Sequence, residues 1–217
     1  MNLFIYGAGG TGRELLDIHY STIKDKIDKK NIYFVDDNKA GSIIDGVKIL
    51  DFMSTIHMGK YNNKYVIAIG EPITRNLLFN KIIINGFCGF NLIHKSTEIS
   101  DSAVFGEGIV VYANSIISSN TNISNNVMIQ FNTVIGHDVA INESSVVSSG
   151  VVIGGGVEVG KNTFIGMGVI LKENIKIGSN SIIGMGSVVY NDIPSDVIAL
   201  GNPARPMRPN TDKKVFK

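Results

Sequence analysis

One histidine and the carboxylate that follows it are the residues best suited to proton transfer in this chain. His137 is the only histidine between Ile99 and Val189, and Asp138 comes directly after it. A neutral imidazole is a competent base near pH 7, and a carboxylate beside its other nitrogen fixes the tautomer and raises its basicity. The pair therefore predicts a general base, with an inert surface histidine as the alternative.

A glycine-rich segment near the start of the sequence predicts a phosphate site. A short apolar run at 3–6 leads into a loop with the pattern G-x-G-x-x-G, and residues 13–18 have helical character. Glycines let the backbone turn sharply and approach a ligand, while the start of a helix presents free N–H groups. A pyrophosphate suits this geometry, and a tight turn without a ligand is the alternative. The candidate residues are Gly7, Gly9, Gly10, Thr11 and Gly12.

Two acidic residues end a second predicted strand at 32–35. Folds with this glycine loop place a carboxylate there, where it accepts hydrogen bonds from a ribose or a base, so Asp36 and Asp37 are candidate nucleotide ligands. A third strand at 66–69 and a helix at 74–84 follow. Only about 92 residues precede the repeats described next, which is enough for half of a dinucleotide-binding fold. We therefore expect a nucleoside diphosphate joined to another group rather than NAD.

The elements that must position His137 repeat every six residues. From Ile99 to Val189 every sixth residue is aliphatic or aromatic, and the position four places later is always small or β-branched. Neither the helical period nor the strand period gives a strict six, so the pattern predicts a β-solenoid with three faces per coil. One coil then takes about eighteen residues, stacked at about 4.8 Å.

Columns of residues eighteen apart show what lies near His137. Gly155 is one coil further on, and this predicts open space for a ligand beside the ring. Gly150, Gly168 and Gly186 share another column, as expected where each coil turns a corner. No insertion interrupts the repeats, so a site must be built from the outer surface of the coils and from neighbouring chains. The uncharged stretch 144–157 predicts an apolar exterior that such chains cover.

Composition excludes several classes of partner. The formal net charge of +1 over 217 residues gives no electrostatic case for nucleic acid or a membrane surface. The single cysteine, Cys88, is expected to be a core thiol in a reducing compartment. No signal peptide or run of about 20 apolar residues is present, so we expect a cytoplasmic protein without membrane insertion. One histidine in the coils argues against a metal site.

The repeats and the glycine loop together resemble a known family. Hexads such as residues 165–170 and 177–182 are similar to those of the left-handed parallel β-helix acyltransferases. Joined to the loop at 7–12 and the acidic pair at 36–37, they resemble the bacterial sialic acid O-acetyltransferase and nucleotide-sugar N-acetyltransferase family. The resemblance implies an α/β half-Rossmann domain at 1–92, a left-handed parallel β-helix at 93–192 and a C-terminal tail at 193–217.

The resemblance also implies roles for individual residues. His137 would be the general base and Asp138 its orienting partner, while the glycine loop, Asp36, Asp37 and Arg75 would hold the nucleotide sugar. One departure is Val146, which stands where many relatives have a second histidine. The residues that would contact acetyl-CoA are Gly155, Gly166, Gly184, Met185, Asn202, Pro203 and Arg205.

The expected reaction is acetyl transfer from acetyl-CoA to the amine of a nucleotide-linked 4-amino-4,6-dideoxy sugar, in surface polysaccharide or glycan biosynthesis. The family implies a homotrimer with active sites between subunits and no metal. A sugar O-acetyltransferase and a non-enzymatic nucleotide-binding solenoid are the alternatives. The nucleotide base and the sugar configuration stay open.

Overall fold

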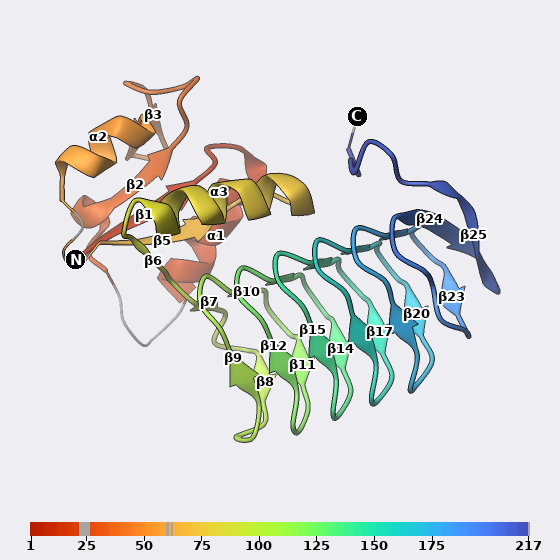
Figure 1. Cartoon of the computed structure of the whole chain (residues 1–217). Helices are drawn as coiled ribbons and strands as arrows, with labels where there is room; N and C mark the ends of the chain where they lie inside the picture. Colours follow the sequence, from red (N-terminus) through yellow and green to blue (C-terminus); the bar gives the residue numbers. More distant parts are fainter. Residues whose placement is uncertain (22–26, 60, 62, 217) are drawn as a thin grey trace.

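The structure is a computed structural model that describes residues 1–21, 27–59, 61 and 63–216. An α/β domain comes first and sits beside the first coils of a parallel β-helix, which extends away from it (Figure 1). The end of the chain returns along the coils toward the α/β domain. Within the described residues, none of the helices is long and apolar enough to cross a bilayer.

The α/β domain contains one sheet in which all strands except β3 run parallel. In spatial order the strands are β3 (Ile43–Ile44), β4 (Val47–Leu50), β2 (Ile32–Val35), β1 (Asn2–Tyr6), β5 (Asn63–Ile67) and β6 (Cys88–Gly89). The helices are α1 (Gly10–Ser21), a short 3-10 helix (Lys29–Asn31), α2 (Phe52–His57) and α3 (Pro72–Ile84).

The three strands expected from the sequence are the three central strands of this sheet. The glycine loop follows β1, which lies between β2 and β5, so the carboxyl ends of all three strands surround it. Strands β4 and β6 extend the sheet on either side. Cys88 lies in β6 and is exposed, so the expectation of a core thiol is wrong.

The β-helix has three sheets, which we call the first, second and third in chain order. The first sheet contains β7 (Leu92–Ile93), β10 (Val110–Val111), β13 (Met128–Ile129), β16 (Val146–Val147), β19 (Phe164–Ile165), β22 (Ile182–Ile183), β24 (Val197–Gly201) and β25 (Ala204–Pro209). The second contains β8 (Glu98–Ile99), β11 (Ile116–Ile117), β14 (Val134–Ile135), β17 (Val152–Ile153), β20 (Ile170–Leu171) and β23 (Val188–Val189). The third contains β9 (Val104–Phe105), β12 (Asn122–Ile123), β15 (Ala140–Ile141), β18 (Glu158–Val159) and β21 (Lys176–Ile177).

The registers confirm the period of eighteen. Val134 pairs with Val152, and Val152 pairs with Ile170. The sixth-residue positions from Val111 onward point inward and form one buried column per sheet, whereas Ile99 and Phe105 lie at the open end. Every corner from Gly108 to Gly186 has a residue in the left-handed region, such as Gly150 at φ 70° and Gly168 at φ 67°. Most other corners have asparagine there, which tolerates that conformation better than other side chains do.

The outer face of the first sheet packs against the α/β domain. Val110, Met128 and Val146 are fully buried in one cluster with side chains of β1 and α1. The expectation that the stretch 144–157 faces outward is therefore wrong for Val146, because the chain's own domain covers it. An exposed apolar row lies on the second sheet and includes Val152 of that stretch. It consists of Ile116 (42% exposed), Val134 (38%), Val152 (42%) and Ile170 (46%).

The C-terminal residues continue the first sheet. Three prolines between residues 203 and 209 favour a tail without a strand ladder, but β24 pairs in parallel with β22 and then forms a hairpin with β25. Pro206 and Pro209 lie in β25, the edge strand of that sheet. An edge strand tolerates proline because its outward N–H positions have no ladder partner to lose.

Candidate active site

The predicted base and carboxylate are hydrogen-bonded at the corner between the second and third sheets. The Nδ1 atom of His137 lies 2.7 Å from Oδ2 of Asp138. This hydrogen bond, and a second from Asn120 Nδ2 at 3.2 Å, lower the pKa of Asp138. An ionised carboxylate only accepts, so Nδ1 carries the proton in the neutral ring and Nε2 is the basic nitrogen. The His137 side chain is 67% exposed.

Gly155 positions the ring rather than leaving space beside it. A Cβ atom at Gly155 would lie 2.6 Å from both Cε1 and Nε2 of His137. The imidazole therefore occupies the space that the missing side chain frees, which corrects the expectation of an open gap for a ligand. The eighteen-residue spacing identified Gly155 as the neighbour of His137. It did not indicate that the His137 ring fills the space over Gly155.

The glycine loop has the tight geometry that its sequence predicts. Gly7 has φ 115°, and its N–H donates to the carbonyl of Val35 at 2.8 Å. A Cβ at Gly12 would clash with the carbonyl oxygen of Gly7, so only glycine fits there. Gly9 and Gly10 have open space on their side-chain side, at the start of α1 beside Thr11. The loop can therefore approach a ligand at Gly9 and Gly10.

The acidic residues beside this loop are paired with lysines that sequence reasoning missed. Lys39 Nζ donates to the carbonyl of Ala8 at 3.1 Å and lies 3.7 Å from Asp36 Oδ2. Lys81 Nζ lies 3.7 Å from Asp37 Oδ2, and Asp37 Oδ1 accepts from the N–H of Phe52. Two cations thus lie at the edge where a diphosphate is expected. The sequence analysis missed these two lysines because they are far from the glycine loop along the chain.

Arg75 does not face the glycine loop. Its side chain is fully buried, and all five guanidinium N–H groups are used within the chain. Nη1 donates to the carbonyls of Ile67 and Ile69, while Nε and Nη2 donate to the carbonyl and side chain of Asn126 in the β-helix. Burial lowers the pKa of Arg75 to about 9. The expectation that Arg75 contacts the nucleotide sugar conflicts with this placement, which joins α3 to the coils.

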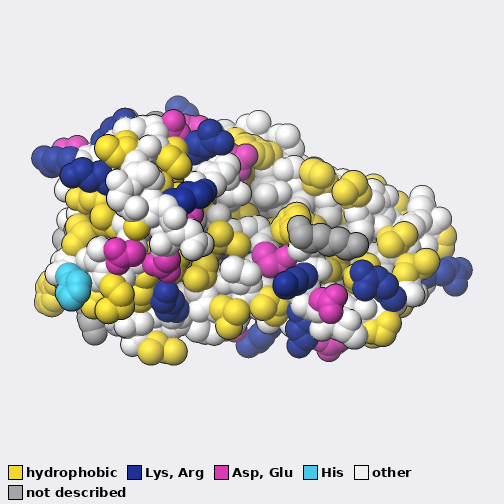
Figure 2. Space-filling model, turned by 90° about the horizontal axis from the view of Figure 1, so that it is seen from above, with side chains coloured by type: hydrophobic (Ala, Val, Ile, Leu, Met, Phe, Trp, Pro, Cys, Tyr) yellow, Lys and Arg dark blue, Asp and Glu magenta, His cyan; other side chains and the backbone are white. Residues whose placement is uncertain are grey.

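Three residues expected to contact acetyl-CoA line one largely apolar cavity of about 450 Å³. Gly166, Gly184 and Met185 lie there, at the corner between the first and second sheets, and Val146 forms part of the wall. The other lining residues are Gly70, Gln130, Ser148, Phe164, Met167, Ile182, Ile183, Val215 and Phe216. Figure 2 views the molecule from above, and on this upper face hydrophobic side chains lie among charged ones.

The cavity is next to the glycine loop. Gly70 lines it and follows Ile69, whose side chain would lie 3.0 Å from a Cβ at Gly7. Ile69 and Gly70 therefore connect the glycine loop to the wall of the cavity. We call this cavity the junction pocket.

The remaining predicted residues lie elsewhere. Asn202 and Pro203 are exposed at the turn between β24 and β25, and Arg205 is exposed in β25, where it pairs with Leu200. Leu200 would contact a Cβ at Gly184. His137 and Gly155 lie on a different corner from the junction pocket, with the second sheet between them. Among the described residues, no group of three or more His, Cys, Asp or Glu side chains could hold a metal ion.

Comparisons with known proteins agree with both parts of the chain. Residues 2–82 match the PglD N-terminal domain, and residues 156–191 match the bacterial transferase hexapeptide of six repeats. PerB from Caulobacter crescentus, solved with CoA and GDP-perosamine, is 27% identical, with a TM-score of 0.86 over 96% of this chain and 98% of that one.

Two further solved structures cover 95% of this chain at 25% identity. WeeI from Acinetobacter baumannii aligns over 100% of its own length with a TM-score of 0.89. The acetyltransferase domain of PglB from Neisseria gonorrhoeae, in complex with acetyl coenzyme A, aligns over 98% with a TM-score of 0.88.

The fold, the glycine loop and these likenesses define the class of protein. The chain is an acetyl-CoA-dependent acyltransferase built on a left-handed parallel β-helix. Its N-terminal part matches the PglD N-terminal domain, and its coils match the bacterial transferase hexapeptide.

Proposed function

We propose that this enzyme transfers an acetyl group from acetyl-CoA to the amine of a nucleotide-linked 4-amino-4,6-dideoxy sugar, in the cytoplasmic synthesis of a surface polysaccharide or glycan. The observation that carries the proposal is the position of the junction pocket beside the glycine loop, at Ile69 and Gly70. The likeness to PerB, solved with CoA and GDP-perosamine, supports this substrate class. The apolar wall at Val146, Gly166 and Gly184 suits the thioester arm.

The proposed mechanism is direct attack without an acyl-enzyme. The amine nitrogen attacks the thioester carbonyl, and Nε2 of His137 takes the proton that the nitrogen loses. A backbone N–H of the coils stabilises the oxyanion of the tetrahedral intermediate. The carbon–sulfur bond then breaks, and the proton passes to the leaving thiolate. Asp138 holds the ring through Nδ1, so that Nε2 stays the accepting atom.

A second copy of the chain is needed to complete this site. One rigid β-helix cannot bring its His137 corner to its own junction pocket, because the second sheet separates them. A neighbouring copy can supply its His137 by packing against the exposed row Ile116, Val134, Val152 and Ile170. We propose a closed homotrimer with three such sites. A monomer in light scattering at working concentrations would contradict this.

The decisive experiment combines one variant with a substrate panel. We expect UDP-, GDP- or dTDP-linked 4-amino-4,6-dideoxy sugars to be acetylated and the matching 4-hydroxy sugars not to be. Replacing His137 by Ala should lower the rate by about 10² to 10⁴. The control His57→Ala, at the exposed end of α2, should keep full activity. Turnover of the hydroxyl sugars alone would mean O-acetylation, and near-normal turnover by His137→Ala would remove it as the base.

A further inference from the structure

The segment 210–216, which we call the strap, returns from β25 to the α/β domain and lies against the junction pocket. We infer that the strap is a wall of the thioester site, with Phe216 as the residue that closes over the coenzyme arm and Glu71 as its clamp. This inference rests on the proposed function, because it takes the ligand of the junction pocket to be a coenzyme A thioester.

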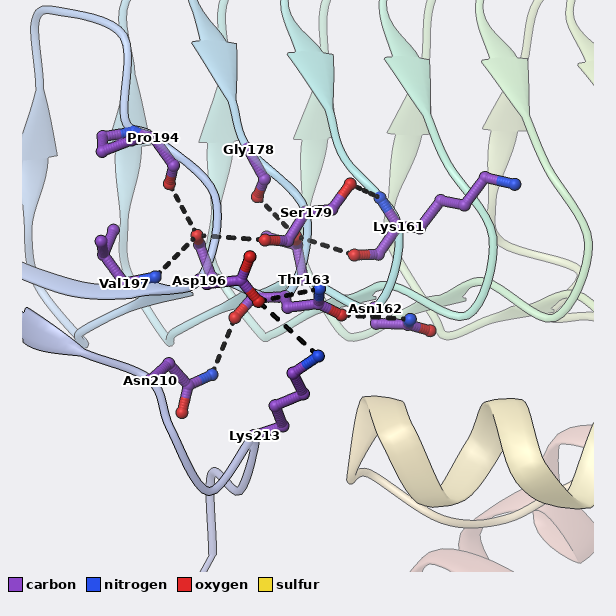
Figure 3. Close-up of polar contacts among 12 residues, drawn as sticks. Lys161, Asn162, Thr163, Gly178, Ser179, Pro194, Asp196, Val197, Asn210 and Lys213 are labelled. Atoms are coloured by element: carbon purple, nitrogen blue, oxygen red, sulfur yellow. Dashed lines mark hydrogen bonds and ion pairs between the residues drawn. The ribbon is translucent and has the colours of Figure 1, made fainter.

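The first anchor of the strap lies on the far coils (Figure 3). Asn210 is buried, and its N–H donates to the carbonyl of Asp196 at 2.7 Å. Its side-chain amide donates to the carbonyl of Asn180 at 2.7 Å. Lys213 Nζ lies 3.7 Å from Asp196 Oδ1, which also accepts from Asn180 Nδ2 at 3.0 Å. The start of the strap, at Asn210 and Lys213, is therefore fixed to the last coils by backbone and side-chain contacts.

The second anchor is a carboxylate of the α/β domain. Glu71 is at the N-cap position of α3, yet its side chain makes no capping hydrogen bond. Its Oε2 instead accepts from the N–H groups of Val215 at 2.9 Å and Phe216 at 3.1 Å. A carboxylate that could cap its own helix is thus used to hold the strap, across an interval of 144 residues.

Phe216 completes the pocket between these anchors. Its ring meets Phe164 edge to face, with centroids 5.7 Å apart, and would lie 3.5 Å from a Cβ at Gly70. Both contacts are with residues that line the junction pocket. Phe216 is still 57% exposed, so a ligand in the pocket can bury more of its ring. Burial of aromatic surface is the main source of affinity at such a wall.

Glu71 retains unused capacity beside the pocket. Its Oε1 atom is buried and has no hydrogen-bond partner among the described residues. A buried carboxylate oxygen without a donor costs free energy. The unpartnered Oε1 atom therefore raises the free energy of the ligand-free site. A hydrogen-bond donor from a bound ligand, such as an amide N–H of the pantetheine arm, would remove this cost.

Calorimetric titration with acetyl-CoA and, separately, with UDP, GDP and dTDP tests the inference on the full chain. Phe216→Ala and Glu71→Ala should each weaken acetyl-CoA binding about tenfold, from lost aromatic burial and a released strap. Glu71→Gln keeps an acceptor oxygen for both N–H groups and should bind nearly as tightly as the unaltered protein. Nucleotide affinity should not change in any of them.

The control is Ile84→Ala, an exposed apolar residue at the end of α3 and outside the junction pocket. The inference about the strap is wrong if Phe216→Ala and Glu71→Ala bind acetyl-CoA as tightly as the parent, with unchanged light scattering and circular dichroism. The proposed function would not be affected by that result. If the parent protein itself binds no acetyl-CoA, the proposed function is wrong, and the inference about the strap is wrong as well.

Discussion

At the scale of single residues, Asp138 has two roles that one substitution can separate. It occupies a corner at φ 58°, where most other coils have asparagine, and it accepts from His137 Nδ1. Asp138→Asn therefore preserves the turn and removes only the ionised acceptor. We expect kcat to fall by up to the ~10² to 10⁴ that a positioned general base contributes, with an unchanged melting temperature. A fall caused by misfolding would instead lower the melting temperature.

The same pair sets the pH dependence. The hydrogen bond from His137 lowers the pKa of Asp138, so the carboxylate stays ionised in mild acid and keeps accepting from Nδ1. We expect the ratio of kcat between the unaltered protein and Asp138→Asn to stay constant across mild acid, because the carboxylate is lost only below its ordinary pKa range. A ratio that falls toward one in mild acid would contradict the assignment.

Sequence alone predicted this pair because its members are adjacent, and it predicted the neighbour Gly155 because the coils repeat strictly. It could not predict that the His137 ring fills the space over Gly155, because the eighteen-residue spacing gives the neighbour of a residue but not the orientation of its side chain. The environment of Arg75 was equally out of reach. Its partner Asn126 is 51 residues away, in a part of the fold whose docking to α3 depends on tertiary packing.

At the scale of elements, Arg75 joins α3 to the coils. Replacing it by Met keeps the length of the side chain but leaves the carbonyls of Ile67, Ile69 and Asn126 without their donor. We expect a loss of about 3 kcal/mol in the free energy of unfolding. Denaturant titration measures it, and Arg13→Met, on the exposed face of α1, is the matched control. Equal stability of the two variants would show that the buried contacts contribute little.

The elements themselves were predictable to different degrees. The period of six defined every sheet of the β-helix, because one inward side chain per face is required at each step. The strands β4 and β6 are short and lack a long apolar run, so their place in the sheet comes from packing. The hairpin of β24 and β25 was missed because prolines count against a strand in general but are tolerated at an edge.

At the scale of the whole molecule, the separation of His137 from the junction pocket allows a mixing experiment. Met185 is exposed at the pocket, so Met185→Trp can obstruct the pocket without disturbing the core. We expect this variant and His137→Ala to be inactive alone. Trimers assembled from equal amounts of both should regain about one quarter of the activity, because about one site in four combines two intact halves. No recovery would place both halves of the site in one chain.

The stacking of the coils also determines which molecules can lie along this wall. Gly166 is two coils and Gly184 three coils beyond the coil that holds His137, as the pairing of β13, β16, β19 and β22 shows. These heights correspond to on the order of 10 to 15 Å along the axis, in indivisible steps of about 4.8 Å. For copies packed at the same height, adding or deleting a coil of about eighteen residues changes the reach between base and pocket by one whole step. The length of an acceptable donor is therefore a discrete property of this fold, whereas its chemical character can vary residue by residue.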